Sequence, residues 1–175
     1  MKTFKQHILE KLKVTKGNIH KYTLFPKTKY ELMLMIDDEI SKNGYECSLN
    51  HIDVSEITDM SRLFYGSDFN GDISGWDVSK VEDMESLFSL SKFNGDISDW
   101  DVSNVENMGF MFYYSKFNGD ISGWDVSGVK HTEDMFAFSK FNGDISGWDV
   151  KNVTHMAKMF NMSPLENNPP KWYKK

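Results

Sequence analysis

Hydrophobic side chains return at a fixed interval of 24 residues along most of this chain. Four phenylalanines open the string FNGDIS and four tryptophans precede Asp-Val, namely Phe69, Phe93, Phe117 and Phe141, then Trp76, Trp100, Trp124 and Trp148. A fainter copy comes before them, with Ile52 in the tryptophan position. The interval predicts five coils, at 45–68, 69–92, 93–116, 117–140 and 141–164. Such coils bury their apolar faces only by stacking on one another.

The two halves of each coil carry different patterns. After the tryptophan, Val81, Met84 and Leu87 have the spacing of one helical stripe, and Ser79 with Glu82 matches a capping box. Before it, residues 72–78 are short and rich in strand-forming types between glycines. The pattern therefore predicts an α/β repeat solenoid in which every coil holds one short strand and one short helix.

Both ends differ from the repeats. Residues 1–44 predict a helical N-terminal cap, because Thr28 and Glu31 form a capping box and Gly44 stands where a helix ends. Within this cap, the basic amphipathic stretch 2–13 either covers the first coil or docks elsewhere as a separate helix. Residues 165–175 end any helix at Pro169 and predict a C-terminal cap or tail.

Several polar and aromatic columns follow from the stacking. Two aspartate columns would place like charges close together, so we expect each carboxylate to accept amides of its own turn, with calcium binding as the alternative. The asparagines of FNGDIS can bond to backbone of the adjacent coil. The tryptophan column is either buried or an exposed aromatic ladder suited to sugars or peptides. His131 and His155 share one column, expected to be solvated, with a transition-metal pair as the alternative.

The repeat FNGDISGWDVSKVEDMESLFSLSK and its copies resemble the BspA-like leucine-rich repeat family of bacteria, over residues 49–164. The stretch before them resembles the entry module that often precedes such repeats. The fourth coil departs from the pattern, with Thr132 where the others carry Met. The resemblance implies a leucine-rich-repeat-like solenoid used for adhesion or protein binding, usually without catalysis.

Charge and composition limit the classes of function that we expect for this chain. The chain has 175 residues and a net charge of −6, but residues 45–164 hold eight basic against twenty acidic residues, which would repel nucleic acid. The longest aliphatic run is too short to span a membrane. Cys47 is the one cysteine, and no nucleophile, acid-base or metal motif accompanies it. We therefore expect no enzyme, no cofactor and no metal. Without a signal peptide the expected location is cytoplasmic, with a virion or cell surface as the alternative if the protein is exported by another route.

Variation between the coils indicates where a partner binds. On the expected helix 105–115, Phe110, Tyr113 and Tyr114 lie off the apolar stripe. Other coils carry polar residues in the column of Phe110 and mixed residues in that of Tyr113, whereas Tyr114 lies in a flanking apolar column. The alternative for Tyr114, and for Phe138 in its column, is packing between coils. The sequence thus predicts a non-enzymatic protein-binding repeat module that uses Phe110, Tyr113 and Tyr114 toward a partner or a second copy. The alternatives are a structural or decorating component of a larger assembly, such as a phage particle, and a carbohydrate-binding adhesin.

Overall fold

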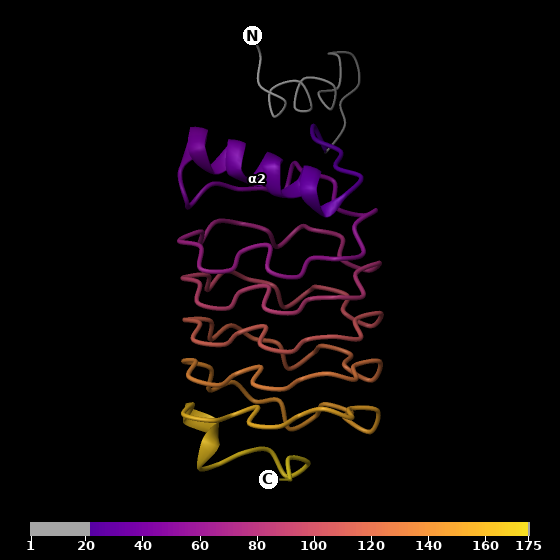
Figure 1. Cartoon of the computed structure of the whole chain (residues 1–175), viewed down its shortest axis with the longest axis vertical. Helices are drawn as coiled ribbons and strands as arrows, with labels where there is room; N and C mark the ends of the chain where they lie inside the picture. Colours follow the sequence, from indigo (N-terminus) through magenta and orange to yellow (C-terminus); the bar gives the residue numbers. More distant parts are fainter. Residues whose placement is uncertain (1–21, 175) are drawn as a thin grey trace.

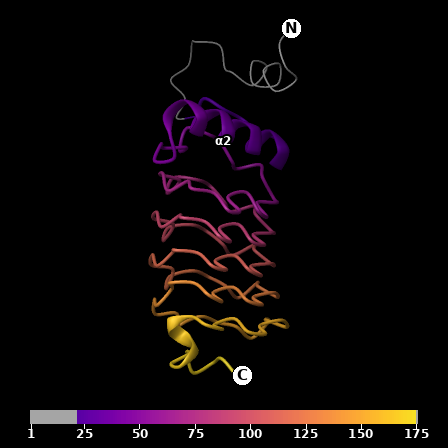
Figure 2. The ribbon, with the colours of Figure 1, turned by 60° about the vertical axis from the view of Figure 1, so that its left-hand side comes forward.

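The computed structural model describes residues 22–174 as a stack of flat coils beneath one helix (Figure 1). Each coil is one complete turn of the chain, and successive coils lie directly upon one another in both views (Figures 1 and 2). The prediction of a helix at 2–13 concerns residues outside this range. No helix among the described residues is long and apolar enough to cross a membrane.

The first element, α2, spans Lys29–Asn43 and lies across the first coil (Figure 1). Its ends agree with the sequence: the Thr28 side chain accepts from the Glu31 amide, and Gly44 ends the helix at φ 85°. Its buried face consists of Leu32, Met35 and Ile36. The helix therefore covers apolar side chains that the first coil would otherwise leave in water.

The prediction of an α/β repeat solenoid is wrong, because in residues 22–174 the coils lack the expected strands and short helices. Within residues 22–174, α2 is the sole α-helix, and the 3-10 turn η1, Pro164–Glu166, is the other regular element. The expected strands and short helices of the coils are absent from this part of the chain. Pairing of strand type is limited to isolated parallel bridges, such as Asp59 with Asp83 and His131 with His155.

Backbone hydrogen bonding explains why the second half of each coil is not a helix. Its amides alternate in direction: the Met84 and Ser86 amides donate to carbonyls of the next coil, whereas the Leu87 amide donates to the Met84 carbonyl of its own coil. An α-helix would need every amide to bond four residues back. In addition, Ser86 at φ 56° and Leu90 at φ 60° are left-handed, which interrupts any helix.

The expected capping boxes are also replaced. The Ser79 amide donates to Asp77 Oδ1 at 3.1 Å, so this serine belongs to a turn begun by aspartate and starts no helix. The same arrangement recurs at Ser103, whose amide donates to Asp101.

Aromatic columns fill the interior. The phenylalanines that open FNGDIS stack with centroids 6.2–6.3 Å apart, and all four are buried. The tryptophans of the repeat are buried as well, with Trp76, Trp100 and Trp124 each 4% exposed. Each indole Nε1 donates to a carbonyl 27 residues earlier, as Trp100 does to Ile73 at 3.2 Å. The buried alternative for this column is therefore confirmed.

The C-terminal segment continues the tryptophan column. Trp172 lies 24 residues after Trp148, stacks on it at 6.4 Å, and donates Nε1 to the Ile145 carbonyl at 3.0 Å. Leu165 is buried beneath the fifth coil. Residues 165–174 thus provide part of a further layer.

Candidate functional site

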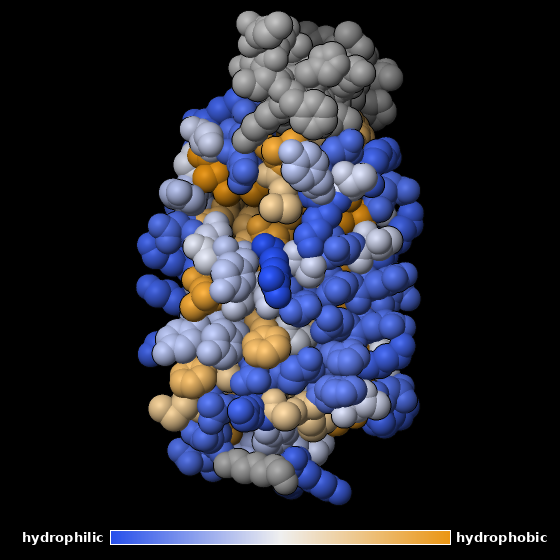
Figure 3. Space-filling view, viewed as in Figure 1, coloured by the Kyte–Doolittle hydropathy of each residue, from blue (hydrophilic) through white to orange (hydrophobic). Residues whose placement is uncertain are grey.

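An apolar ridge runs along one side of the stack. It consists of one residue from each of four successive coils, in the order Leu90, Tyr114, Phe138 and Met162. Leu90, Tyr114 and Met162 are 45%, 53% and 65% exposed, and each is followed by a buried serine. In Figure 3, orange and pale atoms gather along the left of the face, while blue atoms cover its right.

The centre of the ridge is an aromatic cluster of Phe110, Tyr113, Tyr114 and Phe138. Tyr114 stacks on Phe138 with centroids 4.9 Å apart, and Tyr113 meets the edge of Phe138 at 5.6 Å. Phe110 packs against Tyr113 at 5.8 Å. The three residues selected from the sequence are therefore brought together. Phe110 and Tyr113 are half-buried by this packing, whereas Tyr114 is exposed, so Tyr114 stacks on the next coil without being enclosed.

The backbone beneath the ridge is left-handed. Leu90, Tyr114, Phe138 and Met162 have φ between 53° and 60°, and Gly66 has φ 63° in the equivalent position of the first coil. An L-residue in this conformation costs roughly 1–2 kcal/mol, which glycine avoids. The four coils therefore keep bulky apolar side chains at positions where glycine would relieve strain.

The sequence places Leu90, Phe138 and Met162 in one column with Tyr114, but these three were left out of the predicted partner surface, because the column was expected to lie on the flank of a helix. Gly66 is the signal that could have found them. A glycine at one member of a repeated column is typical of a left-handed backbone, and a left-handed residue interrupts the assumed helix.

Lysines accompany the ridge on an otherwise acidic stack. Lys92, Lys116 and Lys140 each follow a ridge residue by two positions, and all three are exposed. Lys92 forms an ion pair with Asp68 at 2.8 Å. A partner with an apolar surface bordered by acidic groups would complement this side of the stack.

The aspartate columns are occupied by their own turns, as expected. The amide of Ser74 donates to Asp72 Oδ1 at 3.0 Å, and the amide of Ser98 does the same with Asp96. These amides are the main reason why the pKa of Asp72 and that of Asp96 lie below the ordinary range. The asparagine prediction is confirmed too, because Asn70 Oδ1 accepts the Asn94 amide at 2.8 Å.

In the histidine column, His155 is exposed as expected and His131 is half-buried. The rings of His131 and His155 stack at 4.5 Å, and His131 Nδ1 lies 3.8 Å from Glu133 Oε2, a buried oxygen without a hydrogen-bond donor among the described residues. In residues 22–174 no group of three or more metal-ligating side chains occurs.

Cys47 is half-buried, and burial is the main cause that raises the pKa of its thiol, with the charge of Glu39 acting in the same direction. Both effects disfavour the reactive thiolate.

Together these features describe a repeat protein with an apolar ridge on one side. The family described as "Mycoplasma protein of unknown function, DUF285" matches residues 35–139 and 114–174. Because the two matches together span most of the chain, the chain belongs to this family. The match establishes a repeat family but is coarser than the resemblance to BspA-like leucine-rich repeats. No curated protein matches the chain, and no solved structure does.

Proposed function

We propose that this chain is a non-enzymatic protein-binding module that presents its apolar ridge to a partner protein. The observation that carries the proposal is the ridge itself, in which four exposed or half-buried apolar side chains occupy consecutive left-handed positions. Strained backbone of this type persists where the surrounding structure over-determines it, and it is enriched at functional sites. Contiguous exposed apolar and aromatic groups are typical of interaction surfaces.

The proposal agrees with the use of BspA-like leucine-rich repeats, which the repeat motif of this chain resembles. In that family the repeats serve adhesion or protein binding. An exposed tryptophan column would have favoured the adhesin alternative by offering rings for stacking on sugars, but that column is buried. The phage-component alternative has no specific observation in its favour.

The test replaces Tyr114 and Phe138 by glycine in one double variant. Each replacement removes the left-handed strain of roughly 1–2 kcal/mol but also the ring contact, worth about 0.5–1.5 kcal/mol. Glycine also increases the chain entropy that is lost on folding. The relief of strain therefore offsets the lost ring contact and this entropy, and the free energy of unfolding is expected to change by no more than about 1 kcal/mol. Proteins captured from the native source by the immobilised wild-type chain should be lost from the variant.

Asp101→Asn with Asp125→Asn is the matched control, since asparagine preserves the acceptor of each turn and these residues lie in another column. The control should capture the same proteins as the wild type. Equal capture by the glycine variant would exclude the ridge as the binding surface. A variant that unfolds would show that the ridge serves stability.

A further inference from the structure

The ridge presents one apolar side chain from each of four coils. Backbone hydrogen bonds and parallel bridges join neighbouring coils, so successive ridge residues lie roughly 4.8 Å apart along the stack. The ring centroids of Tyr114 and Phe138, 4.9 Å apart, agree with this spacing. The ridge from Leu90 to Met162 therefore spans about 14 Å.

This spacing matches the side chains of an α-helix better than those of an extended segment. Helical residues rise about 1.5 Å each, so the apolar stripe i, i+3, i+7 and i+10 lies at about 0, 4.5, 10.5 and 15 Å along a helix. An extended segment places the side chains of one face about 6.6 Å apart, and it would lose register with the ridge within two coils. A helix that lies along the ridge can therefore pack one apolar side chain against each coil.

The backbone amides of the ridge are already occupied. The amides of Leu90, Tyr114 and Phe138 donate to carbonyls of the following coil at 2.8–3.0 Å, and the Met162 amide donates to Glu166 Oε2 at 3.2 Å. Addition of an extended peptide depends on unpaired backbone groups, whereas helix docking depends on side chains alone. The ridge therefore favours a partner that contributes side chains.

A row of three lysines, Lys92, Lys116 and Lys140, borders the ridge. Each follows a ridge residue by two positions, a backbone separation of at most about 7 Å, and the serine between them is buried while the lysine is exposed. Within residues 45–164, this is the one repeat column that holds lysine in three consecutive coils. Lys92 pairs with Asp68, but among the described residues Lys116 and Lys140 have no ion pair. These two charges are therefore free to pair with carboxylates of a partner.

Charge also distinguishes between possible occupants. The amphipathic stretch 2–13 of this chain carries Lys2, Lys5, Lys11 and Lys13 against Glu10 alone, so the row of lysines would repel it. A helix with carboxylates beside its apolar stripe would be attracted.

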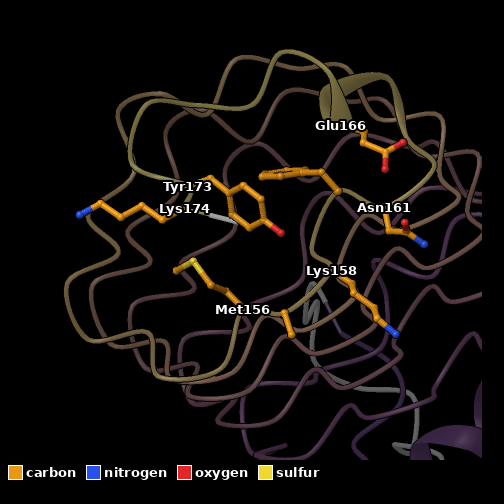
Figure 4. A pocket seen from close by; sticks show the side chains of 8 residues that line it. Met156, Lys158, Asn161, Glu166, Tyr173 and Lys174 are labelled. Atoms are coloured by element: carbon orange, nitrogen blue, oxygen red, sulfur yellow. The ribbon is translucent and has the colours of Figure 1, made fainter.

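A carboxylate of the chain itself lies where the row of lysines ends. The fifth coil has Pro164 in the lysine column, and Glu166 binds the Met162 amide. Figure 4 shows Glu166 and Lys158 along one side of a hollow of about 390 Å³, so charges of both signs border this end. The acidic residues of a partner helix are therefore expected beside the second to fourth coils.

We propose that the ridge binds an acidic amphipathic α-helix of a partner protein. The helix lies along the stack, packs its apolar stripe on the ridge, and places acidic side chains against Lys116 and Lys140. Docking of an amphipathic helix through one apolar stripe is a recurring mode of recognition. The inference rests on the proposed function, because it names the kind of partner that the ridge accepts.

The probe is a fluorescein-labelled peptide, LAALEQELAALEQELAAL, which has leucines at the spacing of the ridge and glutamates on both flanks of the stripe. Repulsion between the glutamates disfavours pairing of the peptide with itself. Fluorescence anisotropy with the full chain should show saturable binding, and circular dichroism should show that the peptide gains helix when it binds. The Tyr114→Gly, Phe138→Gly variant should lose this binding.

Charge reversal tests the row of lysines. Lys116→Glu with Lys140→Glu should weaken binding of the peptide about tenfold, and a peptide with lysine in place of each glutamate should regain that loss against this variant. Lys130→Glu with Lys151→Glu is the matched control, because it makes the same change of charge at two exposed lysines of other columns. The control should bind the original peptide as the wild type does.

Three outcomes would overturn the inference: absence of binding, binding without a gain of helix, and equal binding by the charge-reversed variant and its control. If the chain nevertheless captures proteins that the Tyr114→Gly, Phe138→Gly variant loses, the ridge remains the binding surface and the acidic helix alone is excluded. A concentration-dependent dimer of the wild type, measured by sedimentation and dissociated by the same glycine variant, would assign the ridge to a second copy and would also overturn the inference.

Discussion

At the residue scale, the tryptophans combine two roles that are usually separate. Each ring fills the interior, and each Nε1 satisfies a carbonyl of the preceding coil, as Trp124 does for Ile97 at 3.1 Å. A buried carbonyl that loses its donor costs about 1–3 kcal/mol, more than the net gain of an ordinary hydrogen bond. The repeat therefore depends on tryptophan in particular, since phenylalanine would fill much of the space without donating.

Trp124→Phe should accordingly lower the free energy of unfolding by about 2–4 kcal/mol, from the orphaned carbonyl and the smaller ring. Urea unfolding followed by circular dichroism measures it. Trp172→Phe is the comparison, because that indole makes the same bond to Ile145 but is only partly buried. A loss at Trp124 no larger than at Trp172 would show that burial does not raise the value of this bond.

At the element scale, α2 is attached to the first coil through an apolar face and a few polar contacts, from Lys29 to Asp59 and Ser61 and from Glu39 to His51. Leu32 and Met35 are fully buried, and Lys29 Nζ lies 3.1 Å from Asp59 Oδ1 at the start of the helix. The ion pair is partly exposed and contributes little, so the apolar face dominates the attachment.

Met35→Ala should lower the free energy of unfolding by about 2–5 kcal/mol, the range for buried large-to-small changes. Met33→Ala is the matched control on the same helix, because Met33 is 41% exposed and should cost less than about 1 kcal/mol. Denaturant titration of both variants checks the difference. Similar losses would contradict the assignment of the Met35 face as the attached one.

The contrast between α2 and the coils explains which parts of the fold the sequence could predict. Thr28, Glu31 and Gly44 mark the helix by contacts within a few residues, so local reasoning found its ends. In the coils, the amide of Ser86 bonds to Gly109, and nothing near Ser86 in the sequence signals its positive φ. The 24-residue interval was enough to predict the number of coils and their columns. The local backbone conformation is determined by contacts with the adjacent coil, so it could not be predicted from nearby residues.

The candidate site shows the same division. Phe110, Tyr113 and Tyr114 were found because the third coil differs from the others in two columns, which is a property of the sequence alone. Their clustering with Phe138 depends on where a left-handed residue directs its side chain. The helical spacing expected from the sequence could not predict the direction of these side chains.

At the scale of the whole molecule, the aspartate columns link stability to pH. The Ser74, Ser98 and Ser122 amides and hydroxyls hold the pKa values of Asp72, Asp96 and Asp120 below the ordinary range. A carboxyl whose pKa is lower in the folded than in the unfolded chain contributes stability above its unfolded value, about 3.9, and loses it as the pH falls through the folded value.

The urea midpoint should therefore be nearly constant between about pH 7 and 5 and fall as the pH drops below about 4. A triple variant with asparagine at 72, 96 and 120 keeps the acceptor oxygens but cannot titrate, so its midpoint should fall less steeply. The difference between the two pH profiles is the measurement. Parallel profiles would assign the acid sensitivity to other carboxyl groups.

The hydrogen bond from each tryptophan to a carbonyl 27 residues earlier also affects the order in which coils are completed during synthesis. The carbonyl of Ile73 receives its donor from Trp100, which leaves the ribosome well after the second coil's own tryptophan. Each coil is therefore closed by the one made after it, and α2 is made before any coil needs cover. A nascent chain can add finished layers in the order of translation, with a single incomplete layer at its growing end.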